Sequence, residues 1–119
     1  MNLDNAITAH AEWKMKLRGA IDRCESVDAD SIAADNCCEL GRWLHGDGRR
    51  ACGASPVFKD VVAKHAVFHR AAGRVAREIN ARNYDVARKL LDAGAEYASA
   101  SADVGAAIIG LRRELAKAA

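Results

Sequence analysis

The sequence predicts an all-α fold, and three features of its composition support that prediction. Alanine accounts for 26 of the 119 residues, and it favours helices because its side chain loses no rotamer freedom there. The chain has a single proline, and the aromatic residues that strands favour make up only 5% of it. Half of the chain is apolar, which suffices for one hydrophobic core, so we expect one domain over residues 1–119.

The first helix is expected over about residues 3–25, where Asn2 or Asp4 is suited to cap its start. Apolar residues recur there at steps of three, four or seven, which places them on one face together with a histidine. That face consists of Leu3, Ile7, His10, Leu17, Ile21 and Cys24, with Trp13 at its border. We therefore assign Cys24 to the core.

A short second helix is expected over about residues 36–45. The segment before it, residues 26–35, is polar and predicts a connection. Gly46, Gly48 and Gly53 predict a loop after it.

The third helix has the clearest start signal in the chain. Ser55 is suited to the N-cap, and Pro56 suits the first helical position. An apolar face then continues for about six turns, to an end expected near Asn83. This face consists of Phe58, Val61, Val62, His65, Phe68, His69, Ala72, Val75, Ala76 and Ile79.

A long last helix is expected to begin near Asp85, although Gly94, Gly105 and Gly110 weaken it locally. Its apolar face consists of Val86, Leu90, Tyr97, Val104, Ile108, Leu111 and Leu115. Three long helices and one short helix, joined by modest loops, predict an antiparallel four-helix bundle. The short helix would carry the motif that begins at Cys38.

Charge and the first residues narrow the classes of function. The net charge is +2, from 18 basic and 16 acidic residues, which is too balanced to indicate nucleic-acid binding. No apolar run is long enough to span a membrane, and residues 1–4 lack the features of a secretory signal. We therefore expect a cytoplasmic location. The four cysteines would there be free thiols or metal ligands rather than disulfides: Cys24, Cys37, Cys38 and Cys52.

Two histidines stand out because they lie on an apolar face. His65 and His69 are four residues apart, which puts them on the same side of a helix about 6 Å apart along its axis. Imidazoles directed into a core need partners, because unpaired buried polar groups are costly. His10 lies on the apolar face of the first helix, and the short helix could present Cys38 at the same level.

These four residues suit one zinc ion, which binds imidazole and thiolate ligands in a tetrahedron. Four protein ligands leave no position for water, which favours a structural or sensory site over a catalytic one. We therefore expect Zn²⁺ at His10, Cys38, His65 and His69, and no enzyme activity. Taken one by one, the residues allow another interpretation, since a buried histidine often bonds a carbonyl and a buried cysteine is often a small hydrophobe.

The same residues resemble the motifs of a known family. Residues 38–44, Cys-Glu-Leu-Gly-Arg-Trp-Leu, are similar to the Cys-x-Leu-Gly-x-Trp-Leu motif of the chemoreceptor zinc-binding (CZB) domain. Residues 65–69 resemble its His-x-x-Phe-His element, and residues 10–14 resemble its His-x-x-Trp-Lys element. Residues 46–58 resemble its glycine-containing loop, which leads to Pro-x-Phe. The elements occur in the family's order and cover most of the chain.

The resemblance implies a four-helix bundle in which three histidines and one cysteine hold zinc, here His10, Cys38, His65 and His69. Such domains accompany bacterial chemoreceptors and diguanylate cyclases in chemotaxis and other signal transduction. They report zinc or oxidants such as hypochlorous acid to a signalling output, and some members are homodimers. Cys38, as the one thiolate, is the expected redox-sensitive residue. Loss of zinc is expected to free the short helix, because we expect it to have little core of its own.

Three residues depart from the motif. Cys37 could compete with Cys38 as a metal ligand, but on a helix its side chain would point about 100° away from that of Cys38. His45 is expected to be solvent-exposed, and Cys52, in the glycine-rich loop, is expected to be exposed and oxidisable.

Two other classes of function compete with a zinc sensor. A di-iron enzyme or oxygen carrier would need inward-facing carboxylates, which Asp60, Glu78 and Glu96 do not supply in the required pattern. The alternative left open is a structural helical module for protein–protein contact, with a purely structural metal or none. The sequence does not decide whether the signal is zinc, an oxidant or pH, which output partner is used, or whether the chain is a stand-alone protein or an excised domain.

Overall fold

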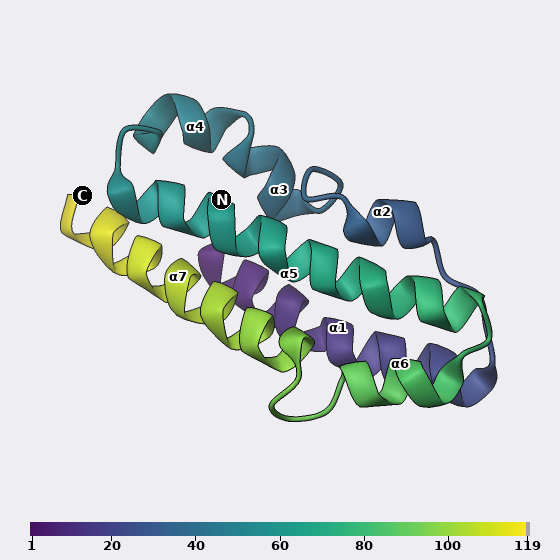
Figure 1. Ribbon diagram of the computed structural model, residues 1–119. Helices are drawn as coiled ribbons and strands as arrows, with labels where there is room; N and C mark the ends of the chain where they lie inside the picture. Colours follow the sequence, from purple (N-terminus) through teal and green to yellow (C-terminus); the bar gives the residue numbers. More distant parts are fainter. Residues whose placement is uncertain (119) are drawn as a thin grey trace.

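The computed structural model describes residues 1–118, which form seven helices and short connections, with no strand among them (Figure 1). Three helices are long: α1 (Leu3–Arg23), α5 (Pro56–Asn80) and α7 (Glu96–Ala118). Four are short: α2 (Ala29–Ala33), α3 (Glu39–Leu44), α4 (Asp47–Cys52) and α6 (Tyr84–Leu90). The prediction of an all-α fold is confirmed.

The seven helices form four arms that alternate in direction along the chain (Figure 1). The arms are α1, then α2 to α4, then α5, then α6 with α7. In Figure 1, α2 to α4 lie on one side of α5, and α6 and α7 lie on the other side. α5 contacts α1, α2, α6 and α7, so it is the central helix of the bundle. The prediction of a four-helix bundle is therefore confirmed, with each arm counted as one helix of the bundle.

The second arm differs from the expected connection, short helix and loop. Residues 29–33 form α2, because Asp28 caps it by accepting a hydrogen bond from the Ser31 N–H and Ile32 buries its side chain. A helix of five residues is too short for its apolar spacing to be visible in the sequence. Its close packing on α5 depends on Gly73, where a Cβ atom would lie only 2.4 Å from the Ala33 Cβ.

The expected glycine loop after the short helix contains α4. Gly48 lies within this helix and against the indole ring of Trp43, where a Cβ atom would come within 2.7 Å of the ring. The glycine is therefore a point of close packing rather than a loop residue. α3 itself is shorter than expected, and Cys38 occupies its N-cap position instead of lying inside it.

The last arm is broken, which corrects the prediction of one long helix. α6 ends at Leu90, and α7 begins only at Glu96. Gly94, in the break, has a φ of +86°, a left-handed conformation that glycine adopts without steric cost. α5 ends at Asn80, and Asn83 occupies the N-cap position of α6 rather than the end of α5.

The core runs along the inner faces of all four arms, and it contains the largest buried side chains. These are Tyr97, Phe68, Leu17, Ile21, Leu40, Leu44, Ile79, Leu91, Ile108 and Leu111. The assignment of Cys24 to the core is wrong. Cys24 is exposed because it is the C-cap of α1, with a left-handed φ of 53° that ends the helix and its periodic face.

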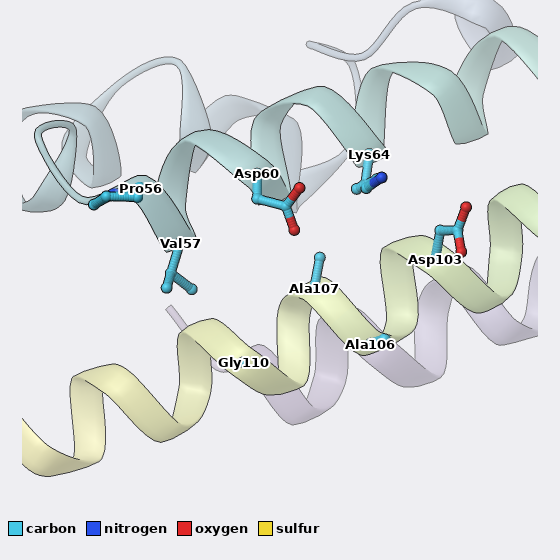
Figure 2. A pocket seen from close by; sticks show the side chains of 8 residues that line it. All are labelled: Pro56, Val57, Asp60, Lys64, Asp103, Ala106, Ala107 and Gly110. Atoms are coloured by element: carbon cyan, nitrogen blue, oxygen red, sulfur yellow. The ribbon is translucent and has the colours of Figure 1, made fainter.

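A surface groove of about 490 Å³ lies between the first half of α5 and the middle of α7. Figure 2 shows Asp60 and Lys64 of α5 facing Asp103 of α7 across it, with Ala106, Ala107 and Gly110 on the α7 side. The groove contains none of the predicted metal ligands. Among the described residues, no helix combines the length and the apolar character that a membrane span requires.

Candidate metal centre

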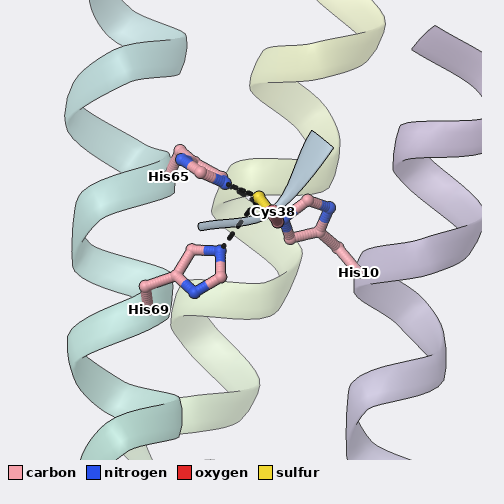
Figure 3. A group of neighbouring side chains, drawn as sticks. All are labelled: His10, Cys38, His65 and His69. Atoms are coloured by element: carbon pink, nitrogen blue, oxygen red, sulfur yellow. Dashed lines mark hydrogen bonds between the residues drawn. The ribbon is translucent and has the colours of Figure 1, made fainter. Parts of the chain in front are cut away.

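The structure brings His10, Cys38, His65 and His69 together between α1, α5 and the start of α3 (Figure 3). One donor atom from each of the four side chains lies within 4.8 Å of the other three. Residues that are remote in the sequence therefore form one compact N₃S cluster, which we call the cage.

α1 contributes His10, which is buried and fixed by its own helix. Its Nδ1 atom lies 2.7 Å from the carbonyl oxygen of Ala6, one turn earlier. Because a carbonyl oxygen can only accept, Nδ1 must carry the proton. The Nε2 atom therefore presents a bare lone pair to the cage.

α5 contributes His65 and His69, which its apolar face carries into the core. The Nδ1 atom of His69 lies 2.8 Å from the carbonyl oxygen of Ile32 in α2. This contact fixes the tautomer of His69 as Ala6 fixes that of His10, so a second bare Nε2 atom points into the cage. Such an outer partner is the usual companion of a metal-binding histidine.

Phe68, on the same face of α5, closes the inner side of the cage. Its ring packs edge-on against the rings of His10 and His69, with centroid distances of 5.2 Å and 5.4 Å. Phe68 is fully buried. The side of the cage that faces the bundle core is therefore apolar.

Cys38 reaches the cage from outside the long helices. Its Sγ atom accepts a hydrogen bond from the N–H of Gly41 at 3.3 Å, as the N-cap of α3. A Cβ atom on Gly41 would lie 1.9 Å from the carbonyl oxygen of Asp35. Only glycine lets the first turn of α3 lie this close to the preceding segment, and that closeness places the sulfur.

The distances within the cage fit a tetrahedral zinc site. Cys38 Sγ lies 3.3, 3.6 and 3.9 Å from the Nε2 atoms of His65, His69 and His10, and the Nε2 atoms of His65 and His10 are 3.1 Å apart. Usual zinc–ligand bond lengths require about 3.6 Å for sulfur–nitrogen edges and about 3.3 Å for nitrogen–nitrogen edges. The four measured edges lie within about 0.3 Å of these values, so the spacing of the donors is close to that of zinc ligands.

Burial controls the protonation of the cage. Desolvation lowers the pKa of His65 to about 3, helped by the neighbouring His69 and His10, and desolvation also lowers the pKa values of His10 and His69. All three imidazoles are thus neutral at pH 7. Converging lone pairs repel one another, and a bound cation removes that repulsion. Burial raises the pKa of the Cys38 thiol, with the Gly41 N–H acting in the opposite direction.

His65 differs from the other two histidines in one respect. Its Nδ1 atom is buried and has no hydrogen-bond partner among the described residues, and the same holds for the hydroxyl of Tyr97. No hydrogen bond from outside the cage therefore holds its ring, whereas carbonyl groups hold the rings of His10 and His69.

The remaining polar candidates lie outside the cage. Cys37 is exposed, and its thiol donates to the Asn36 side chain. His45 is exposed and pairs with Asp35 at 3.1 Å. Cys52 was expected to be exposed, but it is half-buried, because its thiol turns inward to donate to the Gly48 carbonyl in α4.

Sequence reasoning missed the outer partners of the cage. The two groups that orient His10 and His69 are backbone carbonyls, and these carry no side-chain signal. One of them belongs to α2, a helix that was not predicted. The asparagine at the end of α5 was also missed: Asn80 accepts from the N–H of Val27 and donates to its carbonyl, both at 2.8 Å.

Comparison with known families gives one match. Residues 10–76 match the family model described as "Chemoreceptor zinc-binding domain". The match spans more than half of the chain and includes all four cage residues. No curated protein and no solved structure matches the chain.

Proposed function

The chain belongs to the chemoreceptor zinc-binding domain family, and on that premise we propose that it is a zinc-binding sensory domain of a bacterial signalling system. The observation that carries this proposal is the cage. Bare Nε2 atoms of His10 and His69 and the sulfur of Cys38 converge within 4.8 Å of one another in an otherwise apolar core. We propose that these residues and His65 hold one Zn²⁺ ion.

The ligand set supports a sensory rather than a catalytic role. Three imidazoles and one thiolate complete a tetrahedron, which leaves no position for a water molecule or a substrate. When bound, zinc supplies positive charge that keeps Cys38 deprotonated and joins α1, α5 and the start of α3. We therefore propose that the chain is not an enzyme.

Cys38 is the proposed redox-sensitive residue. An oxidant such as hypochlorous acid would react with its thiolate: the sulfur attacks chlorine, the Cl–O bond breaks and hydroxide leaves. Water then replaces chloride at the sulfur and gives a sulfenic acid, so sulfur is oxidised by two electrons and chlorine is reduced to chloride. The sulfenic acid is a poor ligand, and loss of the sulfur contact releases the segment that leads into α3.

The family supports further proposals about context. We propose a cytoplasmic location, where the thiols stay reduced, and an output partner of the chemoreceptor or diguanylate cyclase type. We also propose that the domain works as a homodimer, as some members of the family do.

A single pair of variants tests the metal assignment. The purified chain is expected to contain one zinc per molecule, and Cys38→Ser should weaken zinc affinity by more than about 100-fold, since outer-shell changes alone cost 10- to 100-fold. Cys37→Ser is the matched control, because its thiol lies next in sequence but outside the cage. Competition with a chromophoric chelator measures both affinities. Equal affinities in the two variants would contradict the assignment of Cys38.

A further inference from the structure

A cavity of about 390 Å³ lies against the cage on the side of α2. Cys38 and His69 form part of its wall, and Cys37 lies beside them. Cys38 is only half-buried, whereas the three histidines are buried, so this side is where the cage approaches solvent. We call this space the entry cavity.

The body of the entry cavity is apolar. Trp13 of α1, Val27 of the α1–α2 connection and Ile32 of α2 supply its other large side chains. The volume lies within the range of small-molecule sites, which starts at about 300 Å³. An apolar wall favours uncharged molecules, because a charged one would lose hydration on entry without gaining a partner.

The rim of the entry cavity carries charges of both signs. Hydrogen bonds from the side chain and backbone N–H of Ser31 lower the pKa of Asp28, so its carboxylate is ionised at neutral pH. Two cations lie close to the cavity: Arg42 donates to the carbonyl oxygen of Cys37 at 2.6 Å, and the Nζ atom of Lys16 lies 4.9 Å from the ring of the lining tryptophan. The charges at the rim therefore do not exclude an anion, which is disfavoured instead by desolvation inside the apolar cavity.

We propose that the entry cavity is the route by which small uncharged electrophiles reach the Cys38 sulfur, and that it selects against anionic ones. The inference rests on the proposed function, because it makes Cys38 the reactive ligand. It adds the chemical class of the molecules to which the site responds. Hypochlorous acid and hydrogen peroxide belong to that class, whereas oxidised glutathione is both bulky and anionic.

Methanethiosulfonates provide matched probes of this selectivity. The Cys38 thiolate attacks the sulfenyl sulfur of the reagent, a new S–S bond forms, and methanesulfinate leaves with the electron pair of the broken bond. Methyl methanethiosulfonate is uncharged, and the 2-sulfonatoethyl reagent is an anion with the same leaving group. The thiol of Cys24, which is exposed at the end of α1, serves as an internal reference within the same molecule.

The experiment follows the mass of the Cys38 and Cys24 peptides over time in the full chain, together with zinc release to a chromophoric chelator. Relative to Cys24, Cys38 should react at least about tenfold faster with the uncharged reagent than with the anionic one, a difference of about 1.4 kcal/mol. Asp28→Asn keeps a good N-cap residue for α2. It should change this ratio of rates by less than the difference between the two reagents, because desolvation rather than the charge of Asp28 excludes the anion. Equal relative rates for the two reagents would overturn the charge selection.

Plug variants test the route itself. Cys37→Phe should slow modification of Cys38 by the uncharged reagent at least about tenfold relative to Cys37→Ser, since a large side chain there narrows the cavity. If Cys37→Phe does not fold, Ser31→Phe is compared with Ser31→Ala instead. This substitution narrows the entry cavity from the side of α2. An unchanged rate in a folded plug variant would overturn the route. The peptide masses report on the cavity whether or not zinc is bound, so absence of zinc would contradict the proposed function alone.

Discussion

The three histidines and the cysteine of the cage are held in different ways. The histidines lie inside helices of 21 and 25 residues, they are buried, and backbone carbonyls fix two of their rings. Cys38 lies at the N-cap of a six-residue helix, is half-buried and borders a cavity. The nitrogens are thus preorganised by the bundle, whereas the sulfur depends on a short, solvent-facing segment. This difference supports the proposal that Cys38 is the responsive part of the site.

The difference does not extend to all of α3. Leu40 and Leu44 are buried, and Trp43 packs edge-on against Phe58 at a centroid distance of 5.9 Å. α3 therefore has more core than the sequence indicated, and we expect it to stay anchored when Cys38 leaves the cage. The segment expected to move is residues 34–38, which has no regular helix and connects α2 with α3.

The largest predicted effect concerns the three histidines, which the bundle holds in place. His65→Ala removes one of the four proposed ligands, which is fully buried, and should weaken zinc affinity by more than the 10- to 100-fold typical of outer-shell changes. His45→Ala is the control, because His45 is exposed and pairs with Asp35 outside the cage. Chelator competition measures both. A similar loss in the two variants would show that the cage is not the zinc site.

The histidines and Cys38 should also differ in how their contributions to the stability of the zinc-free chain depend on pH. The folded-state pKa values of the cage histidines are lowered, so their contribution to stability is complete above pH 6.5 and is lost as the pH falls. For His65 the loss continues to about pH 3, at about 1.4 kcal/mol per pH unit. The pKa of Cys38 is raised, so its contribution is lost only as the pH rises above its ordinary value of 9.0.

Denaturant unfolding of the metal-free chain across this pH range measures both losses. Cys38→Ser should leave the acid loss in place, and His65→Gln should reduce it. Stability that stays constant between pH 6.5 and pH 4.5 would contradict the assignment of buried, neutral histidines.

Two glycine substitutions should change the free energy of unfolding by a smaller amount. Together they distinguish the close packing that places the Cys38 sulfur from the general effect of glycine on helix stability. Gly41→Ala forces a Cβ atom against the Asp35 carbonyl, so α3 must shift away, and the chain should lose about 1–3 kcal/mol of unfolding free energy. Gly105→Ala is the matched control within α7, where nothing lies within 4 Å of the new Cβ. It should gain about 0.5–1 kcal/mol from helix propensity alone. Changes of the same sign in both variants would exclude the packing explanation.

The sequence predicted the frame of the molecule better than the details of its second arm. The periodic faces of α1 and α5 are long enough to show which residues share a side, so His10, His65 and His69 could be placed together. α2 and α4 are too short to show periodicity, and Gly48 and Gly73 serve close packing rather than turns. The break at Gly94 depends on a single left-handed residue within an apolar pattern that continues across it.

The carbonyl partners of the cage could not be predicted, because every residue has a carbonyl group. The entry cavity could not be predicted either, since it depends on how α2, which packs on α5, is placed relative to α1 and the start of α3. The sequence indicated which four side chains form the cage. Only the structure showed the contacts that hold them in place.

The smallest predicted effect tests whether that support is separate from the cage. Asn80 holds Val27 through two hydrogen bonds and so fixes the α1–α2 connection, which forms a wall of the entry cavity. Both bonds are solvent-exposed, so Asn80→Ala should cost only about 1 kcal/mol of unfolding free energy. Zinc affinity should change by less than about threefold, because that corresponds to under 1 kcal/mol and none of the four ligands moves. Modification of Cys38 by methyl methanethiosulfonate should become faster, because the loosened wall opens the cavity. A large loss of zinc affinity would show instead that the position of the three histidines depends on the cavity wall. The histidines would then not be fixed independently of the segment that carries Cys38, and the contrast between them and Cys38 would not hold.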